Sequence, residues 1–286
     1  MASSIRVIPT PVGQGSALII PGSTTFERAN SDYLAITPST DGNEKTFTIS
    51  WWFRLTETPG VAGAAGQSFF IATTIPAETE NIQLYLSGDQ LHVNTRHDGG
   101  SWTNTKPSRR FRDNSAWYHM VVAIDTTQNT GTDRLKIYIN GELNSDWDAD
   151  GRASITQNTD LNFNSTVTHC IGKQGTYSNV YGQFNMSHFY IIDGQALDAS
   201  NFGYTDPLTN TWRPKKYTNT FGKNFPNNRG DIWSSNTCTG TPYSGQSFTS
   251  AFDGRFDTYV HSQYPGVLKW VPPSTVSYTH LRAHET

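Results

Sequence analysis

Alternate aspartates after residue 145 have the spacing of a metal site. Asp146, Asp148 and Asp150 are followed by Gly151, which matches the opening of a calcium loop, D-x-D-x-D-G. Such a loop offers carboxylate oxygens to a hard cation that takes about six to eight oxygen ligands. The twelfth position, where an EF-hand places a bidentate glutamate, is Gln157 here. Two interpretations follow, a partial calcium (Ca2+) site and a solvated loop.

Loop-borne aromatic residues are a second candidate chemistry, because a flat ring stacks on a sugar ring while nearby amides bond its hydroxyls. Trp102 follows a Gly-Gly-Ser run and has Asn104 beside it, and Trp147 lies inside the aspartate loop. Tyr177 and Tyr181 belong to a Gly-rich run. Large aromatic residues also pack in cores and rims, so each has a structural alternative. We predict ligand contact for these five residues.

Known catalytic arrangements do not occur in the sequence. It contains no G-x-S-x-G nucleophile motif and no H-E-x-x-H zinc motif. Of its seven glutamates, Glu78 and Glu80 are the closest pair, and they follow Pro76 in a polar stretch. A lone histidine within a strand, His119, is expected to be hydrogen-bonded in place rather than to act as a ligand. We therefore predict that the protein is not an enzyme.

The composition predicts an all-β protein. The chain is rich in β-branched and aromatic residues and in turn formers, and its formal net charge is only −3. This charge balance argues against a nucleic-acid partner. No apolar run approaches the roughly 20 residues that span a bilayer, and no signal peptide is recognisable. Arg109-Arg-Phe-Arg112 is expected to form ion pairs or a solvated cluster, with an acidic glycan as the alternative.

Runs of β-forming residues, several of them alternating apolar and polar, predict strands that would position these side chains. In the first, Phe47, Ile49, Trp51 and Phe53 share one face by the period of two. Asn140-Gly141 is a hairpin-turn signal. Strands at this spacing, without a long helical period, predict a two-sheet antiparallel jelly-roll sandwich. The predicted strands are residues 47–55, 68–75, 81–86, 91–94, 117–124, 134–139 and 184–192.

Two blocks of sequence resemble a known superfamily. Trp117-Tyr-His119 begins a strand, and Leu135-Lys-Ile-Tyr-Ile-Asn-Gly-Glu142 follows. Together they resemble the paired central strands of the concanavalin A-like lectin/glucanase superfamily, in its laminin-G-like branch. The resemblance implies a lectin-like sandwich that often carries calcium at a loop rim. Retaining glycosidases on this fold bear E-x-D-x-x-E on one strand, and this chain has no such triple.

Further segments resemble structural proteins of marine bacteriophages. These include residues 189–197, 202–206 and Trp212-Arg-Pro-Lys-Lys-Tyr217, together with the early run 26–34. The resemblance implies a component of a virion, such as a tail-fibre or tail-associated adhesin. After Gly222 the sequence departs from that pattern.

The end of the chain resembles a different family. Ala251-Phe-Asp-Gly-Arg-Phe-Asp-Thr258 is similar to a loop of discoidin-type, galactose-binding-like modules. That loop often encloses a structural calcium ion, which the resemblance assigns here to Asp253. The last residues, 276–286, resemble the translated end of a transposon-based sequencing adapter. They are expected to be a tail foreign to the protein, so His280 and His284 are not metal ligands.

These observations predict five segments. They are an N-terminal extension or first strand (1–25), a sandwich (26–214), a linker (215–230), an incomplete discoidin-like fragment (231–275) and the adapter-derived tail (276–286). The leading functional hypothesis is a non-catalytic carbohydrate-binding module of a phage virion that recognises a cell-surface glycan. The alternatives are a purely structural domain that packs against other virion proteins and a glycoside hydrolase, which the missing carboxylates disfavour.

Overall fold

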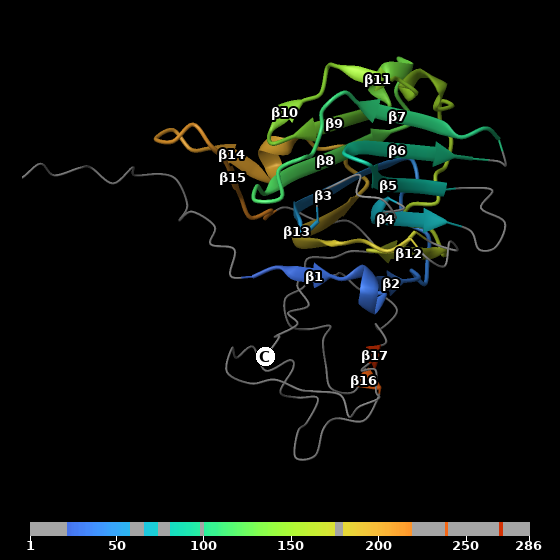
Figure 1. Cartoon of the computed structure of the whole chain (residues 1–286). Coiled ribbons are helices and arrows are strands. Elements are labelled where there is room, and N and C mark those ends of the chain that lie inside the picture. Colours follow the sequence, from blue (N-terminus) through green and yellow to red (C-terminus); the bar gives the residue numbers. More distant parts are fainter. Residues whose placement is uncertain are drawn as a thin grey trace, which may run out of the picture.

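The structure is a computed structural model of the whole chain (Figure 1). The residues that it describes are 22–57, 66–73, 81–97, 100–174, 180–218, 238–239 and 269–270. In this part of the chain the regular elements are strands and single-turn 3-10 helices, with no α-helix. The predicted all-β class is confirmed.

Two antiparallel sheets form the sandwich. The first has six strands, in the order β1 (Thr24–Phe26), β13 (Phe184–Asp193), β3 (Thr46–Leu55), β8 (Tyr118–Asp125), β9 (Leu135–Ile139) and β10 (Glu142–Leu143). The second has seven, in the order β11 (Trp147–Ala149), β7 (Thr103–Pro107), β6 (Gln90–Arg96), β5 (Asn81–Ser87), β4 (Gln67–Thr73), β12 (Thr168–Ile171) and β2 (Leu34–Ile36). This is the predicted two-sheet jelly-roll sandwich.

Short elements complete the described part. A projecting hairpin pairs β14 (Gly203–Thr205) with β15 (Trp212–Pro214), and Figure 1 shows it beside the ends of β8 and β9. A separate pair joins β16 (Cys238–Thr239) to β17 (Lys269–Trp270). The single-turn helices are η1 (Arg28–Asn30), η2 (Gly131–Asp133), η3 (Arg152–Ser154) and η4 (Ala199–Asn201).

The core lies between the two sheets and follows from alternation along β3. Phe47, Ile49, Trp51 and Phe53 are fully buried, as the period of two predicts. Phe69 of the other sheet packs against two of them. Its ring centroid lies 4.5 Å from that of Phe53 and 5.5 Å from that of Trp51. Burying large side chains of this kind contributes about 1.5–3 kcal/mol each.

A second apolar cluster covers the outer face of the six-stranded sheet. Tyr190 of β13 packs against Phe202 and Tyr217, with ring centroids 5.8 and 6.3 Å away. The hydroxyl of Thr48 ties the covering segment to β3, because it donates to the carbonyl of Gln195 at 2.7 Å. Part of the outer face of this sheet, around β13 and β3, is thereby covered by the chain itself, and Tyr217 within the predicted linker is buried.

The predicted strands agree with the observed ones to within one or two residues in the described part. The hairpin turn after β9 is also confirmed, since Asn140 and Gly141 both have positive φ, 50° and 89°. The strands that the sequence analysis did not find are short or carry few apolar residues, such as β7, which reads Thr-Asn-Thr-Lys-Pro.

Candidate functional site

The outer face of β5 to β7 is polar, although it belongs to the middle of a sheet. Along β5 and β6 the apolar residues Leu84, Leu86, Leu91 and Val93 face the core, so the alternate residues lie on the other side. We call this other side the amide face. It is formed by Asn81, Gln83, Tyr85, His92, Asn94, Asn104 and Lys106.

Strand register aligns three amides in a row across the amide face. Gln83 of β5 is opposite Asn94 of β6, which is opposite Asn104 of β7. Directly opposite residues in antiparallel strands have Cβ atoms about 4.5–5.5 Å apart. Gln174 extends the row, because its Nε2 donates to Oε1 of Gln83 at 3.3 Å. The amide groups thus form one continuous line.

Several amide oxygens of this face are buried without a partner. In the described residues, four asparagines have a buried Oδ1 that accepts no hydrogen bond, and three of them are Asn81, Asn94 and Asn104. The fourth, Asn185, lies on the other sheet. A buried unpaired acceptor costs about 1–3 kcal/mol, so natural proteins rarely keep such groups together without a function. Rotation about the terminal torsion lets each amide present either its oxygen or its nitrogen.

A hydrogen-bonded chain fixes the polar groups beside the row. Nδ2 of Asn94 donates to the Tyr85 hydroxyl at 3.1 Å, and that hydroxyl lies 3.3 Å from Nδ1 of His92. Burial, followed by the charges of Lys106 and Arg110, lowers the pKa of His92 to about 4. Burial raises the pKa of Tyr85. Both groups are therefore neutral at neutral pH, and each offers hydrogen-bonding capacity without a charge.

The predicted ligand residue Trp102 lies at one end of this face. It directly precedes β7, and its side chain is 39% exposed. The guanidinium of Arg96 stands 5.6 Å from its ring centroid and donates to the carbonyl of Gly100 at 2.8 Å. Asn104, also predicted from sequence, follows two residues later in β7. The structure brings these two predicted residues to the same face.

Trp147 is positioned differently. It lies in β11 opposite Pro107, is partly buried and packs against the core. The guanidinium of Arg152 is 4.3 Å from its ring centroid. The side chain is therefore engaged inside the protein, and the structure does not bring it together with Trp102.

The aspartate loop is a strand in the structure. Only Trp147–Ala149 forms this strand, paired with β7, and the three aspartates are exposed to solvent, as the solvated-loop interpretation expects. Oδ2 of Asp148 accepts from Arg110 at 2.6 Å and from Gln90 at 2.8 Å, and hydrogen bonds from Ser108 and these two residues lower its pKa. Asp150 forms a two-point ion pair with Arg152.

These contacts separate the three predicted calcium ligands. In the described part of the chain, no group of three or more His, Cys, Asp or Glu side chains is arranged to hold a metal ion. Arginines already neutralise the carboxylates of Asp148 and Asp150, whereas Asp146 contributes its backbone carbonyl to Ser108 and Asn144. Calcium at Asp146, Asp148 and Asp150 stays a prediction. Asp253 lies outside the described residues.

The Gly-rich run contributes a smaller aromatic cluster at the β2 edge. Nζ of Lys173 stands 4.7 Å from the ring centroid of Tyr33 and 5.6 Å from that of Tyr181. Tyr33 is 46% exposed. The sequence analysis named Tyr181 but not Tyr33, which carries no distinguishing local motif. Tyr177 lies outside the described residues.

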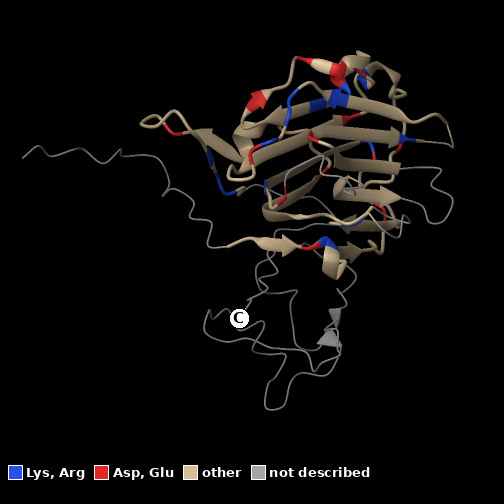
Figure 2. Cartoon of the chain, in the orientation of Figure 1, with Lys and Arg blue, Asp and Glu red and all other residues tan. Residues whose placement is uncertain are grey.

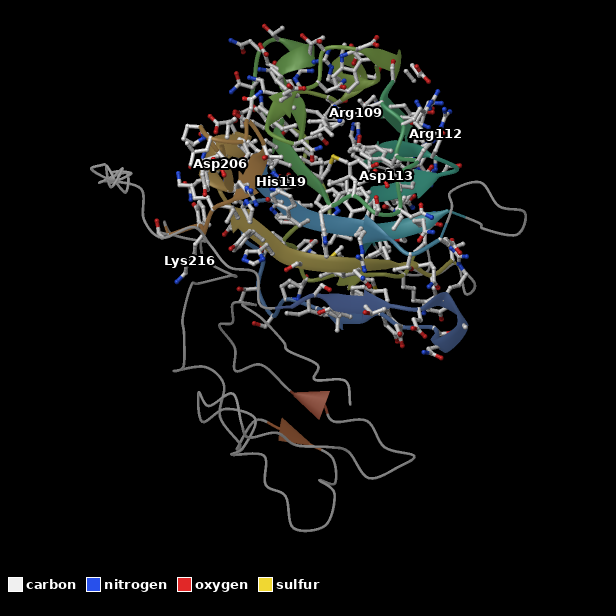
Figure 3. The ribbon with its side chains drawn as sticks, turned by 60° about the vertical axis from the view of Figure 1, so that its left-hand side comes forward. Arg109, Arg112, Asp113, His119, Asp206 and Lys216 are labelled. Atoms are coloured by element: carbon white, nitrogen blue, oxygen red, sulfur yellow. The ribbon has the colours of Figure 1, made fainter. Side chains whose placement is uncertain are left out.

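His119 has the buried structural role expected for it. Its Nε2 is 3.0 Å from the Ser50 hydroxyl, and its Nδ1 accepts from Nε1 of Trp212 at 2.9 Å. Burial, with a smaller contribution from His188, lowers its pKa to about 3. Figure 3 shows His119 near the hairpin that carries Asp206 and away from Arg109 and Arg112.

The basic cluster forms the intramolecular ion pairs expected for it. Arg110 pairs with Asp89 and Asp148, and Arg112 pairs with Asp89 at 2.5 Å. The charges of Arg110 and Arg112 are therefore at least partly neutralised.

Comparison with known proteins identifies the family. Residues 28–201 match the protein family described as the concanavalin A-like lectin/glucanases superfamily. The chain belongs to this superfamily. No curated protein sequence matches the chain. Within the described residues, the superfamily domain has no helix long and apolar enough to cross a membrane.

Solved structures with a similar fold have low sequence identity to this superfamily domain. The heptameric SAP-like pentraxin of Limulus polyphemus is 15% identical over 62% of this chain and 75% of its own, with a TM-score of 0.40. Domains LG4-5 of mouse laminin alpha1 are 10% identical, covering 81% of this chain and 55% of theirs, with a TM-score of 0.43. The CBM40 of Ruminococcus gnavus IT-sialidase, bound to α2,3 sialyllactose, is 16% identical over 56% of this chain and 91% of its own, with a TM-score of 0.34.

The sequence analysis missed most of the amide face. Asn81, Gln83 and Tyr85 alternate along a strand that it predicted, and His92 and Asn94 alternate along the next. Their shared face was therefore readable from the period of two. These side chains lie within strands, whereas the aromatic residues predicted to bind a ligand belong to predicted loops.

Proposed function

We propose that this domain is a non-catalytic carbohydrate-binding module and that the amide face is its binding surface. The observation that carries the proposal is the row of Gln83, Asn94 and Asn104, in which the buried oxygens of Asn94 and Asn104 have no hydrogen-bond partner. Sugar hydroxyls both donate and accept hydrogen bonds, so neutral amides, a phenol and an imidazole suit them. A rigid sheet holds these groups in place and lowers the entropic cost of binding.

The exposed ring at the end of the row supports the same function. Trp102 offers an apolar surface beside hydrogen-bonding groups, which is the combination that sugar rings require. Membership of a superfamily that contains both lectins and glucanases agrees with a carbohydrate ligand. Because one fold hosts many functions, the site rather than the fold carries the proposal.

We further propose that the domain belongs to a phage virion, as a tail-fibre or tail-associated adhesin that recognises a cell-surface glycan. The support is the resemblance of residues 189–197, 202–206 and 212–217 to phage structural proteins. Tail or baseplate genes beside this gene on the source DNA are the expected finding. Neighbours unrelated to a virion would remove this part of the proposal and leave the glycan-binding part untouched.

The alternative is a purely structural virion domain, which packs against other virion proteins and binds no sugar. The full chain would be applied to an array of bacterial and algal polysaccharides, with calcium and with a chelator. Binding to a defined subset supports the module, whereas silence under both conditions supports the structural alternative. The calcium arm also tests the prediction made for Asp146, Asp148, Asp150 and Asp253.

A matched pair of variants locates the binding surface. Asn104→Leu removes an amide from the row and is expected to weaken glycan binding about tenfold or more. The same substitution should leave the free energy of unfolding unchanged or raise it by up to about 1 kcal/mol, because it removes an unpaired buried oxygen. Asn185→Leu is the control, since it removes an equally unpartnered oxygen from the other sheet and should leave binding unchanged. Equal binding by both variants and the parent would refute the assignment of the surface.

A further inference from the structure

The charged residues of strands β4 to β7 are all cations, whereas the neighbouring strand β11 carries Asp148, which is paired with Arg110. Strands β4, β5, β6 and β7 contain no aspartate or glutamate at any position, and Figure 2 shows β4 and β5 without charged residues. The outward positions at the two ends of the face are cationic, Arg96 in β6 and Lys106 in β7. An anionic ligand would therefore meet no like charge on these strands.

Lys106 is the cation whose charge is available to a ligand. It lies next to His92 in the sheet, because Val93 is paired with Thr105, and it follows Asn104 by two residues on the same face. Burial is the main cause of the lowered pKa of His92, and the charges of Lys106 and Arg110 lower it further, as expected for cations close to this face. Among the described residues no carboxylate forms an ion pair with Lys106, whereas Arg110 pairs with Asp89 and Asp148.

Distances along the strand suit a single sugar unit. Residues two apart on a β-strand are about 7 Å apart, so one substituted sugar can contact Asn104 and Lys106 together. The amides of Asn94 and Asn104 would bond its hydroxyls, and the ammonium would bond a charged substituent. A charge-assisted hydrogen bond of this kind is roughly twice as strong as a neutral one.

We propose that the amide face selects an anionic glycan, and that Lys106 binds its carboxylate or sulfate group. This inference rests on the proposed function, because it names the class of sugar that the same surface takes. The shared chemistry is a sugar bearing a fixed negative charge. A uronic acid and a sulfate ester are the two sources of that charge.

Binding of the full chain to paired polysaccharides tests the proposal. The probes are alginate, polygalacturonate and hyaluronan, each beside its carboxyl-reduced, neutral form, and carrageenan beside its desulfated form. We expect at least one charged member to bind about tenfold more tightly than its neutral counterpart. This preference should shrink as salt is raised toward 1 M, where the Debye length falls to about 3 Å.

A lysine variant assigns the preference to this face. Lys106→Gln should bring binding of the charged polysaccharide down to about the level of the neutral one, while binding of the neutral one stays unchanged. Lys136→Gln is the control, because Lys136 is a half-exposed lysine on β9 of the other sheet. It should change neither value.

Each outcome decides between the two proposals. Equal binding of charged and neutral forms, or full charge preference in Lys106→Gln, overturns the anionic-glycan proposal and leaves carbohydrate binding standing. Failure of every probe, charged and neutral, together with a silent array, overturns both. Binding to alginate, polygalacturonate or hyaluronan assigns the charge to a carboxylate, and binding only to carrageenan assigns it to a sulfate.

Discussion

Replacing Gly141 by alanine should destabilise the domain through a steric clash with the ring of Trp212, which cannot move without losing a partly buried hydrogen bond. Gly141 has φ +89°, and a Cβ added there would lie 2.5 Å from Cε3 of Trp212. That indole donates to Nδ1 of the buried His119 at 2.9 Å. Positive φ costs an alanine about 1–2 kcal/mol, and displacement of the indole leaves a buried acceptor unpaired, at about 1–3 kcal/mol. The expected loss is therefore about 2–5 kcal/mol.

Gly88→Ala is the matched control for this prediction. Gly88 also has positive φ, +58°, in the turn between β5 and β6, but an added Cβ would meet no atom within 4 Å. The Gly88→Ala variant should therefore lose only the cost of positive φ, about 1–2 kcal/mol of the free energy of unfolding. The effect of alanine on the unfolded chain is common to both variants and cancels. Urea unfolding followed by tryptophan fluorescence measures both losses, and equal losses would refute the role assigned to Trp212.

Two further predictions concern pH and metal. Burial lowers the pKa of His119 to about 3 and of His169 to about 4, below the ordinary value near 6.5. Between about pH 6.5 and pH 4 the unfolded state binds more protons, so each histidine should lower the free energy of unfolding by up to about 1.4 kcal/mol per pH unit as the pH falls. Denaturation curves across this window check the slope, and a flat profile contradicts it. For the aspartate loop, a calcium ion would have to displace the arginines from Asp148 and Asp150, so an unfolding temperature that calcium leaves unchanged would favour these ion pairs over the predicted metal site. A calcium-dependent rise that Asp148→Asn abolishes would instead establish the metal site.

Features that depend on neighbours in sequence were readable without a structure. The buried face of β3 follows from the alternation of Phe47, Ile49, Trp51 and Phe53, because successive side chains of any strand point to opposite sides. The turn at Asn140 and Gly141 follows from two residues that tolerate positive φ. The lectin-like superfamily was recognisable from two strand motifs, and the family match bears it out.

Long-range pairing decided the site. The hairpin of β5 and β6 is local in sequence. Strand β7 pairs with β6, although the sequence of β7 has no apolar alternation that would predict a strand. Only this third strand places Asn104 beside Asn94 and completes the row of amides. Likewise, Asp148 lies far from Arg110 in sequence, so no local pattern indicates that the two form an ion pair.

The residues thus determined the strands, their buried faces and the superfamily, because each of these depends on side chains a few positions apart. The tertiary structure decided which polar side chains of strands distant in sequence meet, since the register between such strands depends on which of their faces is buried in the core. Trp147 illustrates the difference. By sequence it resembled Trp102, yet pairing of β11 with β7 turned its ring toward the core and left Trp102 beside the amide face.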